Sequence, residues 1–143
     1  MIITQMTAAH VPQIAALEKA IFSDAWSERS IASELENELA LWLVALDGDT
    51  VAGYIGSQTV LGEADMLNLA VEPEYRRQGV GRKLVEELIS RLDAHCLTLE
   101  VRVSNEPAQN LYASMGFAQV GRRRNYYEKP REDALILRKE WEN

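Results

Sequence analysis

The chain of 143 residues has a single cysteine, Cys96, and only two histidines, His10 and His95. A lone cysteine cannot form an internal disulfide, and zinc sites need several Cys or His ligands, so we expect no metal site and a reducing compartment. His95 and Cys96 are neighbours in or beside a strand, where successive side chains diverge, which makes them a poor nucleophile and base pair. We therefore interpret Cys96 as a core residue.

Long apolar segments are also missing. The longest run, Leu39 to Leu46, is far too short to cross a bilayer. The first residues, Met-Ile-Ile-Thr-Gln, lack the basic and then apolar pattern of a secretory signal. The sequence therefore predicts a soluble cytoplasmic protein with no membrane partner.

Positive charge is scarce relative to negative charge. The chain has 15 Lys and Arg against 22 Asp and Glu, a formal net charge of −7. Binding nucleic acid through its phosphates needs a basic surface, so we expect no direct nucleic-acid binding, and cationic partners such as amines or basic peptides are mildly favoured. With 47% hydrophobic and 26% charged residues, the composition is that of a globular protein, and the length suits one domain over residues 1–143.

The most informative stretch is Met66–Leu92. Apolar residues alternate across Leu67–Val71, as in a strand, and Pro73 ends the pattern because it has no N–H for a ladder. A turn containing Gly79 and Gly81 follows and opens a segment with apolar residues at helical spacing. Glycines let the backbone approach a ligand, and the first N–H groups of a helix attract anions, so this turn is a candidate phosphate cradle.

Other interpretations of the turn stay open. A nucleotide P-loop needs Gly-Lys followed by Ser or Thr, whereas Gly81 is followed by Arg82 and Lys83, which disfavours it. A dinucleotide fingerprint needs a third glycine where this chain has Leu84, although Glu100 imitates the acidic residue expected about 20 positions later. A simple turn without any ligand remains the plainest alternative.

Pattern and turn signals along the chain predict a mixed α/β domain in the order strand, helix, helix, three strands, helix, strand, helix, two strands. The strand–helix–strand unit around the glycine turn implies a parallel pair that flanks a ligand crevice. The predicted helices follow Thr7, Ser27, the glycine turn and Ser104, the last running to Met115. The predicted strands lie at Ile2-Ile3, 41–46, 51–60, 67–71, 97–103, 118–123 and 134–138.

Three polar side chains would face that crevice. Glu100 lies between Leu99 and Val101 and so points away from them, while Asn105 and Tyr112 follow on the next turn and helix. Equally, Glu100 can be a solvated strand residue, Asn105 a helix cap and Tyr112 a core aromatic. Trp26, on the connection between the first two helices, either covers the core edge or forms a wall of a substrate cleft.

These residues resemble a known family. Arg76–Gly81, Arg-Arg-Gln-Gly-Val-Gly, is similar to the pyrophosphate-binding motif of the GNAT family of N-acetyltransferases, and the element order resembles their fold. The sequence resembles more specifically the branch that acetylates the N-terminal alanine of a bacterial ribosomal protein. The matching residues are Asn68–Pro73, Leu99–Arg102, Ser104-Asn105, Ala108, Leu111-Tyr112, Gly116-Phe117, Asn125–Tyr127 and Glu132–Ala134.

The resemblance implies acetyl-CoA as cosubstrate, Glu100 as the base and Tyr112 as the acid. It implies no metal. It also implies that acetyl-CoA is contacted by Leu69, Ala70, Val71, Arg77, Gln78, Gly79, Val80, Gly81, Arg82 and Asn105.

The resemblance further implies that the acceptor is a protein N-terminal α-amine, most specifically the alanine of a small-subunit ribosomal protein. The acceptor cleft is expected between 22–27 and 125–127, with contacts from Trp26, Asn125, Tyr126 and Tyr127. Ala25 stands where the family pattern has proline, a departure on the acceptor side. The alternatives are acetylation of a small amine or a lysine side chain, and an acetyl-CoA sensor without turnover.

Overall fold

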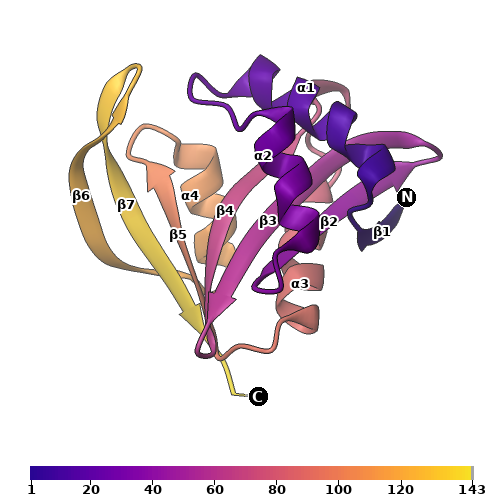
Figure 1. The fold of residues 1–143 in the computed structure, drawn as a ribbon. Helices are drawn as coiled ribbons and strands as arrows, with labels where there is room; N and C mark the ends of the chain where they lie inside the picture. Colours follow the sequence, from indigo (N-terminus) through magenta and orange to yellow (C-terminus); the bar gives the residue numbers. More distant parts are fainter. Residues whose placement is uncertain (143) are drawn as a thin grey trace. The chain divides into compact units, whose positions relative to one another are not determined.

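The computed structural model describes residues 1–142 and shows a mixed α/β fold in the expected order of elements (Figure 1). The strands are β1 Ile2–Gln5, β2 Ala40–Asp47, β3 Thr50–Val60, β4 Glu63–Val71, β5 Cys96–Arg102, β6 Ala118–Glu128 and β7 Arg131–Glu140. The α-helices are α1 Val11–Ile21, α2 Glu28–Ser33, α3 Val80–Arg91 and α4 Glu106–Ser114. Short 3₁₀ turns lie at Ala8–His10, Glu34–Glu36 and Pro73–Tyr75.

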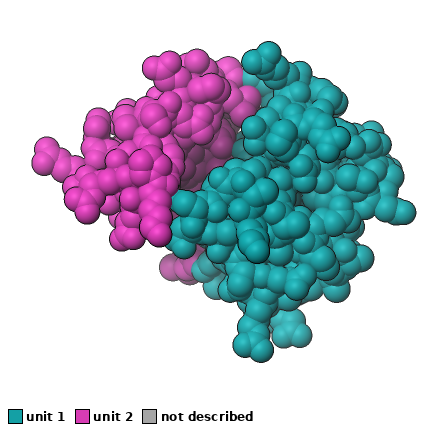
Figure 2. Space-filling model, turned by 90° about the horizontal axis from the view of Figure 1, so that it is seen from above, with its two compact units in different colours: residues 1–58, 67–92 teal, residues 59–66, 93–143 magenta. Residues whose placement is uncertain are grey.

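The chain forms two compact units, coloured teal and magenta in Figure 2. The first contains Met1–Gln58 with Leu67–Leu92, and the second contains Thr59–Met66 with 93–142 of the described residues. Strand β4 contributes its end to the first unit and its beginning to the second. Each unit is described separately.

In the first unit, β1, β2 and β3 pair antiparallel, and a tight turn from Asp47 to Thr50 joins β2 to β3. Side chains alternate across β2. Trp42 lies in one core cluster with residues of α1 and α2, and it packs so closely on Gly56 of β3 that a methyl group there would overlap the ring. Gly53 faces Leu84 of α3 on the other side of the strands. Helices therefore cover both faces of these strands.

In the second unit, the start of β4 runs parallel to β5, with Glu63 opposite Cys96 and Asp65 opposite Thr98. This confirms the parallel pair that the sequence predicts. Strand β7 lies antiparallel to β5 and β6, so the order is β4-β5-β7-β6. Cys96 is fully buried, as expected of a core residue.

The last two strands differ from the sequence prediction. The expected spans 118–123 and 134–138 are too short, because β6 runs to Glu128 and β7 begins at Arg131. The irregular pairing between Arg123 and Tyr127 breaks the alternation that would have marked a continuous strand. The first helix is also preceded by a 3₁₀ turn, whereas Ser27 caps α2 as predicted by accepting from the Ser30 N–H.

Candidate active site

The glycine turn of the first unit joins the end of β4 to helix α3. Arg77 (φ 65°) and Gly79 (φ 77°) both adopt left-handed backbone conformations, which turn the chain sharply into the helix. Gly79 is the N-cap residue, and no side chain caps the helix, so its first N–H groups are not satisfied by a capping side chain. Glycine suits this position because other residues pay a steric cost there.

The outer side of the glycine turn is exposed. Arg76, Arg77, Gln78 and Gly79 are exposed, and a Cβ added to Gly79 would meet no heavy atom within 4 Å. The outer side of the turn is therefore open to a ligand. Backbone N–H donors, the positive end of the α3 dipole and nearby arginines all favour a negatively charged group. Contacts from this turn to acetyl-CoA stay a prediction.

The strand residues expected to contact acetyl-CoA differ in burial. Ala70 is buried at 6% exposure, whereas Leu69 and Val71 are half-buried. The Arg76 Nε donates to the Val71 carbonyl at 3.2 Å, tying the start of the turn back to the end of β4. The backbone of this strand end is thus held in place next to the turn.

A buried carboxylate that the sequence prediction missed lies in the same unit. Glu18 of α1 is fully buried. Its oxygens accept hydrogen bonds from the Tyr54 hydroxyl of β3, from the Asn68 Nδ2 at 2.8 and 3.0 Å, and from the Trp26 N–H at 2.9 Å. Burial raises the pKa of Glu18, although these hydrogen bonds act in the opposite direction. The signal in the sequence was an acidic residue within the apolar stripe of a helix, at i+4 from Ile14.

Two kinds of contact hold Trp26 in place: its backbone N–H donates to Glu18, and its indole ring packs on another aromatic ring. The indole packs edge to face with Trp42 at a centroid distance of 5.4 Å, and Trp42 stacks on Tyr54 at 6.1 Å. Trp26 is half-buried against the core cluster, in agreement with the core-edge interpretation. Its expected role in acceptor binding stays a prediction.

In the second unit, Glu100 of β5 points away from buried Leu99 and Val101, as predicted. One of its oxygens lies 3.4 Å from the Arg123 Nε. A hydrogen bond to Glu100, followed by burial, raises the pKa of Tyr126 to about 12. Burial raises the pKa of Tyr127, and the charge of Glu100 adds to the shift. The structure thus brings together Glu100, Tyr126 and Tyr127, which the sequence placed in separate roles.

Tyr112 of α4 is 4% exposed and packs edge to face with Phe117 at a centroid distance of 5.5 Å. Burial, with a smaller contribution from Tyr127, raises the pKa of Tyr112 well above the ordinary value. Its hydroxyl therefore keeps its proton at neutral pH and can act as a hydrogen-bond donor. Tyr112 is thus a core aromatic, and its role as the acid stays a prediction.

Asn105 and Asn125 have clear structural roles. The Asn105 Oδ1 accepts from the Ala108 N–H at 3.2 Å and so caps α4. Asn125 adopts φ 51° in the irregular part of β6, and its N–H donates to the Asp133 Oδ1 at 2.9 Å. Contacts of Asn105 with the cosubstrate and of Asn125 with the acceptor stay predictions.

Within residues 1–142, no group of three or more His, Cys, Asp or Glu side chains is arranged to hold a metal ion. None of the helices in the same part of the chain is long and apolar enough to span a membrane.

In the first unit, a strand passes through an open glycine turn into a helix, an arrangement that suits a protein with a phosphate-bearing ligand. The comparison with known proteins makes this specific, because the model of the acetyltransferase (GNAT) family matches residues 11–117. The chain belongs to the acetyltransferase (GNAT) family and is an acyltransferase.

Relatives with assigned activities match almost the whole chain. The Escherichia coli (strain K12) [ribosomal protein bS18]-alanine N-acetyltransferase is 39% identical over an alignment of 140 residues that covers 94% of this chain and 94% of the other. The crystal structure of the Escherichia coli ribosomal-protein-S18-alanine N-acetyltransferase matches with a TM-score of 0.89 and 37% identity, covering 99% of this chain and 94% of the other. A structure of the NatC complex bound to Gag peptide and CoA matches with a TM-score of 0.80 and 27% identity, covering 99% of this chain and 100% of that one.

Proposed function

We propose that this protein transfers the acetyl group of acetyl-CoA to the N-terminal α-amine of a protein, specifically to the alanine of ribosomal protein bS18. The observation that carries the proposal is the 39% identity with the Escherichia coli bS18-alanine N-acetyltransferase over 94% of both chains. The match leaves no large part of either chain uncovered, which supports one catalytic domain spanning residues 1–143. Acting on a ribosomal protein would place the reaction in the cytoplasm.

Acetyl-CoA is the proposed cosubstrate. The family supports this, as does the matching structure of the NatC complex, which is bound to CoA. The first unit offers the open glycine turn from Arg77 to Arg82 for the pyrophosphate, and we assign the backbone of Leu69–Val71 to the acetyl and pantetheine end. A backbone N–H that stabilises the charge developing on a carbonyl oxygen is worth about 2.7 to 4 kcal/mol in other enzymes.

The second unit supplies the proposed proton transfers. A protein α-amine has a pKa of about 7.7 to 8.0, so much of it is protonated at neutral pH and must lose a proton before it attacks the thioester. Glu100 is assigned this role, directly or through water. The CoA thiolate that leaves needs a proton, and the Tyr112 hydroxyl, which stays protonated at neutral pH, is assigned as donor. Tyr126 and Tyr127, which neighbour Glu100, are assigned to the acceptor peptide together with Asn125 and Trp26.

The acceptor class can be tested by measuring CoA release with two peptides of one sequence. Both begin like bS18 with alanine and keep their lysines, but one is blocked at its N-terminus. We expect release only with the free amine, because the blocked peptide offers only lysine side chains. Equal release would indicate lysine acetylation. Binding of acetyl-CoA without release on any amine would indicate a sensor and contradict the proposal.

Tyr112→Phe removes one hydroxyl from a buried ring and leaves its packing on Phe117 in place. We expect turnover to fall by about 100-fold, the lower end of typical general-acid contributions, with little change in thermal stability. Steady-state kinetics and a thermal melt of the same preparation check this. Phe117→Leu is the matched control, since it alters the same ring pair without touching the hydroxyl. Unchanged turnover in Tyr112→Phe would restrict Tyr112 to a packing role.

A further inference from the structure

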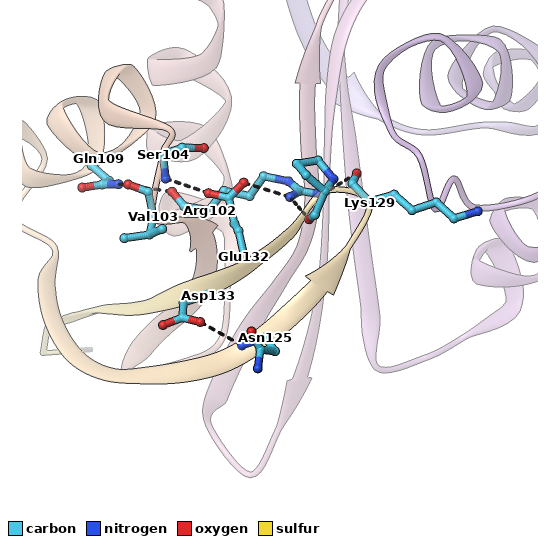
Figure 3. A network of polar contacts seen from close by, with 9 residues as sticks. Arg102, Val103, Ser104, Gln109, Asn125, Lys129, Glu132 and Asp133 are labelled. Atoms are coloured by element: carbon cyan, nitrogen blue, oxygen red, sulfur yellow. Dashed lines mark hydrogen bonds and ion pairs between the residues drawn. The ribbon is translucent and has the colours of Figure 1, made fainter.

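The hairpin formed by β6 and β7 carries Asn125, Tyr126 and Tyr127. One side chain of β5, Arg102, holds the turn of this hairpin (Figure 3). The Arg102 Nη1 donates to the Pro130 carbonyl at 3.0 Å and to the Glu132 Oε2 at 3.0 Å, and Nη2 donates to the Lys129 carbonyl at 3.3 Å. One guanidinium therefore binds three residues at the turn, Lys129, Pro130 and Glu132. Arginine suits this arrangement because its planar fork has several donors in fixed directions.

The same guanidinium also fixes an aromatic ring. The Arg102 Cζ lies 4.2 Å from the centroid of the Tyr127 ring, and Tyr127 packs edge to face on Tyr126 at 5.0 Å. The Arg123 Cζ lies 5.8 Å from the centroid of the Tyr126 ring, and the Arg123 Nε lies 3.4 Å from an oxygen of Glu100, two residues before Arg102 on β5. A series of contacts thus runs from Arg102 through both tyrosines and Arg123 to the proposed base.

Glu132 links the Arg102 guanidinium to the loop that follows β5. Its Oε1 accepts from the Ser104 N–H at 2.8 Å while its Oε2 binds Arg102. Hydrogen bonds from Ser104 and the Arg102 guanidinium lower the pKa of Glu132, so the carboxylate is ionised at neutral pH. The Gln109 Nε2 donates to the Arg102 and Val103 carbonyls at 3.2 and 2.9 Å, which ties α4 to the same strand end.

We propose that Arg102, paired with Glu132, is a positioning residue that holds Tyr126 and Tyr127 in the orientation needed to bind the acceptor peptide. This inference rests on the proposed function. Arg102 does not touch the reacting atoms in this role. Arg102 fixes the hairpin turn, and the turn fixes the two tyrosine rings. Without Arg102 the free hairpin would be more mobile, so peptide binding would have to order it at a larger entropic cost.

The test compares Arg102→Lys with wild type on the free-alanine peptide. Lysine keeps the charge but cannot bind three acceptors in a fork or lie flat on Tyr127. We expect the KM for peptide to rise about tenfold, while kcat and the Kd for acetyl-CoA change by less than about twofold. Hydrogen exchange of the amides in 126–132 should become faster. Glu132→Gln should show the same pattern, and it carries the test if Arg102→Lys fails to fold.

Arg91→Lys is the matched control, because Arg91 forms an exposed ion pair with Glu87 on α3 and lies outside the hairpin. It should leave both the KM and the exchange of 126–132 unchanged. An unchanged KM in both hairpin variants would overturn the inference while leaving the proposed function intact. A raised KM without faster exchange would mean that Arg102 contacts the peptide directly, which also overturns it. Failure of the wild type on every free-amine peptide would overturn the proposed function, and the inference with it.

Discussion

Replacing Glu100 by glutamine should lower turnover on the free-alanine peptide by about 100-fold or more, while the Kd for acetyl-CoA stays nearly unchanged. Glutamine has almost the same shape as glutamate, but it cannot take a proton from the ammonium group. The lost ion pair with Arg123 is partly exposed and contributes about 1 kcal/mol or less to stability. Single-turnover kinetics and direct titration of acetyl-CoA separate the two quantities.

The pH dependence sharpens this prediction. Above about pH 8 most of the α-amine is already deprotonated, so the deficit of Glu100→Gln relative to wild type should shrink as the pH rises. Glu63→Gln is the matched control, since Glu63 is an exposed carboxylate of the same unit paired with Arg138. It should keep wild-type turnover. Equal losses of turnover and acetyl-CoA affinity in Glu100→Gln would refute its assignment as the base.

Replacing Glu18 by alanine should destabilise the protein by about 3 kcal/mol. The change leaves the Tyr54 hydroxyl, the Asn68 amide and the Trp26 N–H without their shared acceptor in a buried site. Each unsatisfied buried donor costs about 1 to 3 kcal/mol, and local rearrangement or water recovers part of the sum. Urea denaturation monitored by circular dichroism measures the change in the free energy of unfolding.

Glu86→Ala provides the control for this prediction, because Glu86 is exposed on α3 and the same atoms are removed there. Its free energy of unfolding should stay within about 0.5 kcal/mol of wild type. A similar small effect of Glu18→Ala would show that the carboxylate adds nothing to stability and that its three donors find other partners. The Glu18 network would then not account for the position of Trp26.

Local patterns were sufficient to predict the order of the elements. The strand–turn–helix around Gly79 was recognisable because strand alternation, a proline that ends the strand and helical spacing all occur within one short stretch. The cap at Ser27 was predictable for the same reason, since its partner lies three residues away. The extension of β6 past Arg123 was not, because the irregular pairing there depends on Asp133 in the opposing strand.

In the candidate site, too, some features were predictable from local patterns and others were not. The sequence by itself determined which residues carry the family's motifs, among them the glycine turn, Glu100 and Tyr112. Only the tertiary structure decided which side chains surround them. Glu18 meets Asn68 across a separation of 50 residues, and Arg102 meets Glu132 across 30. Such pairs depend on strand register and helix packing, which no local pattern encodes, and so the supporting contacts of the site came from the fold.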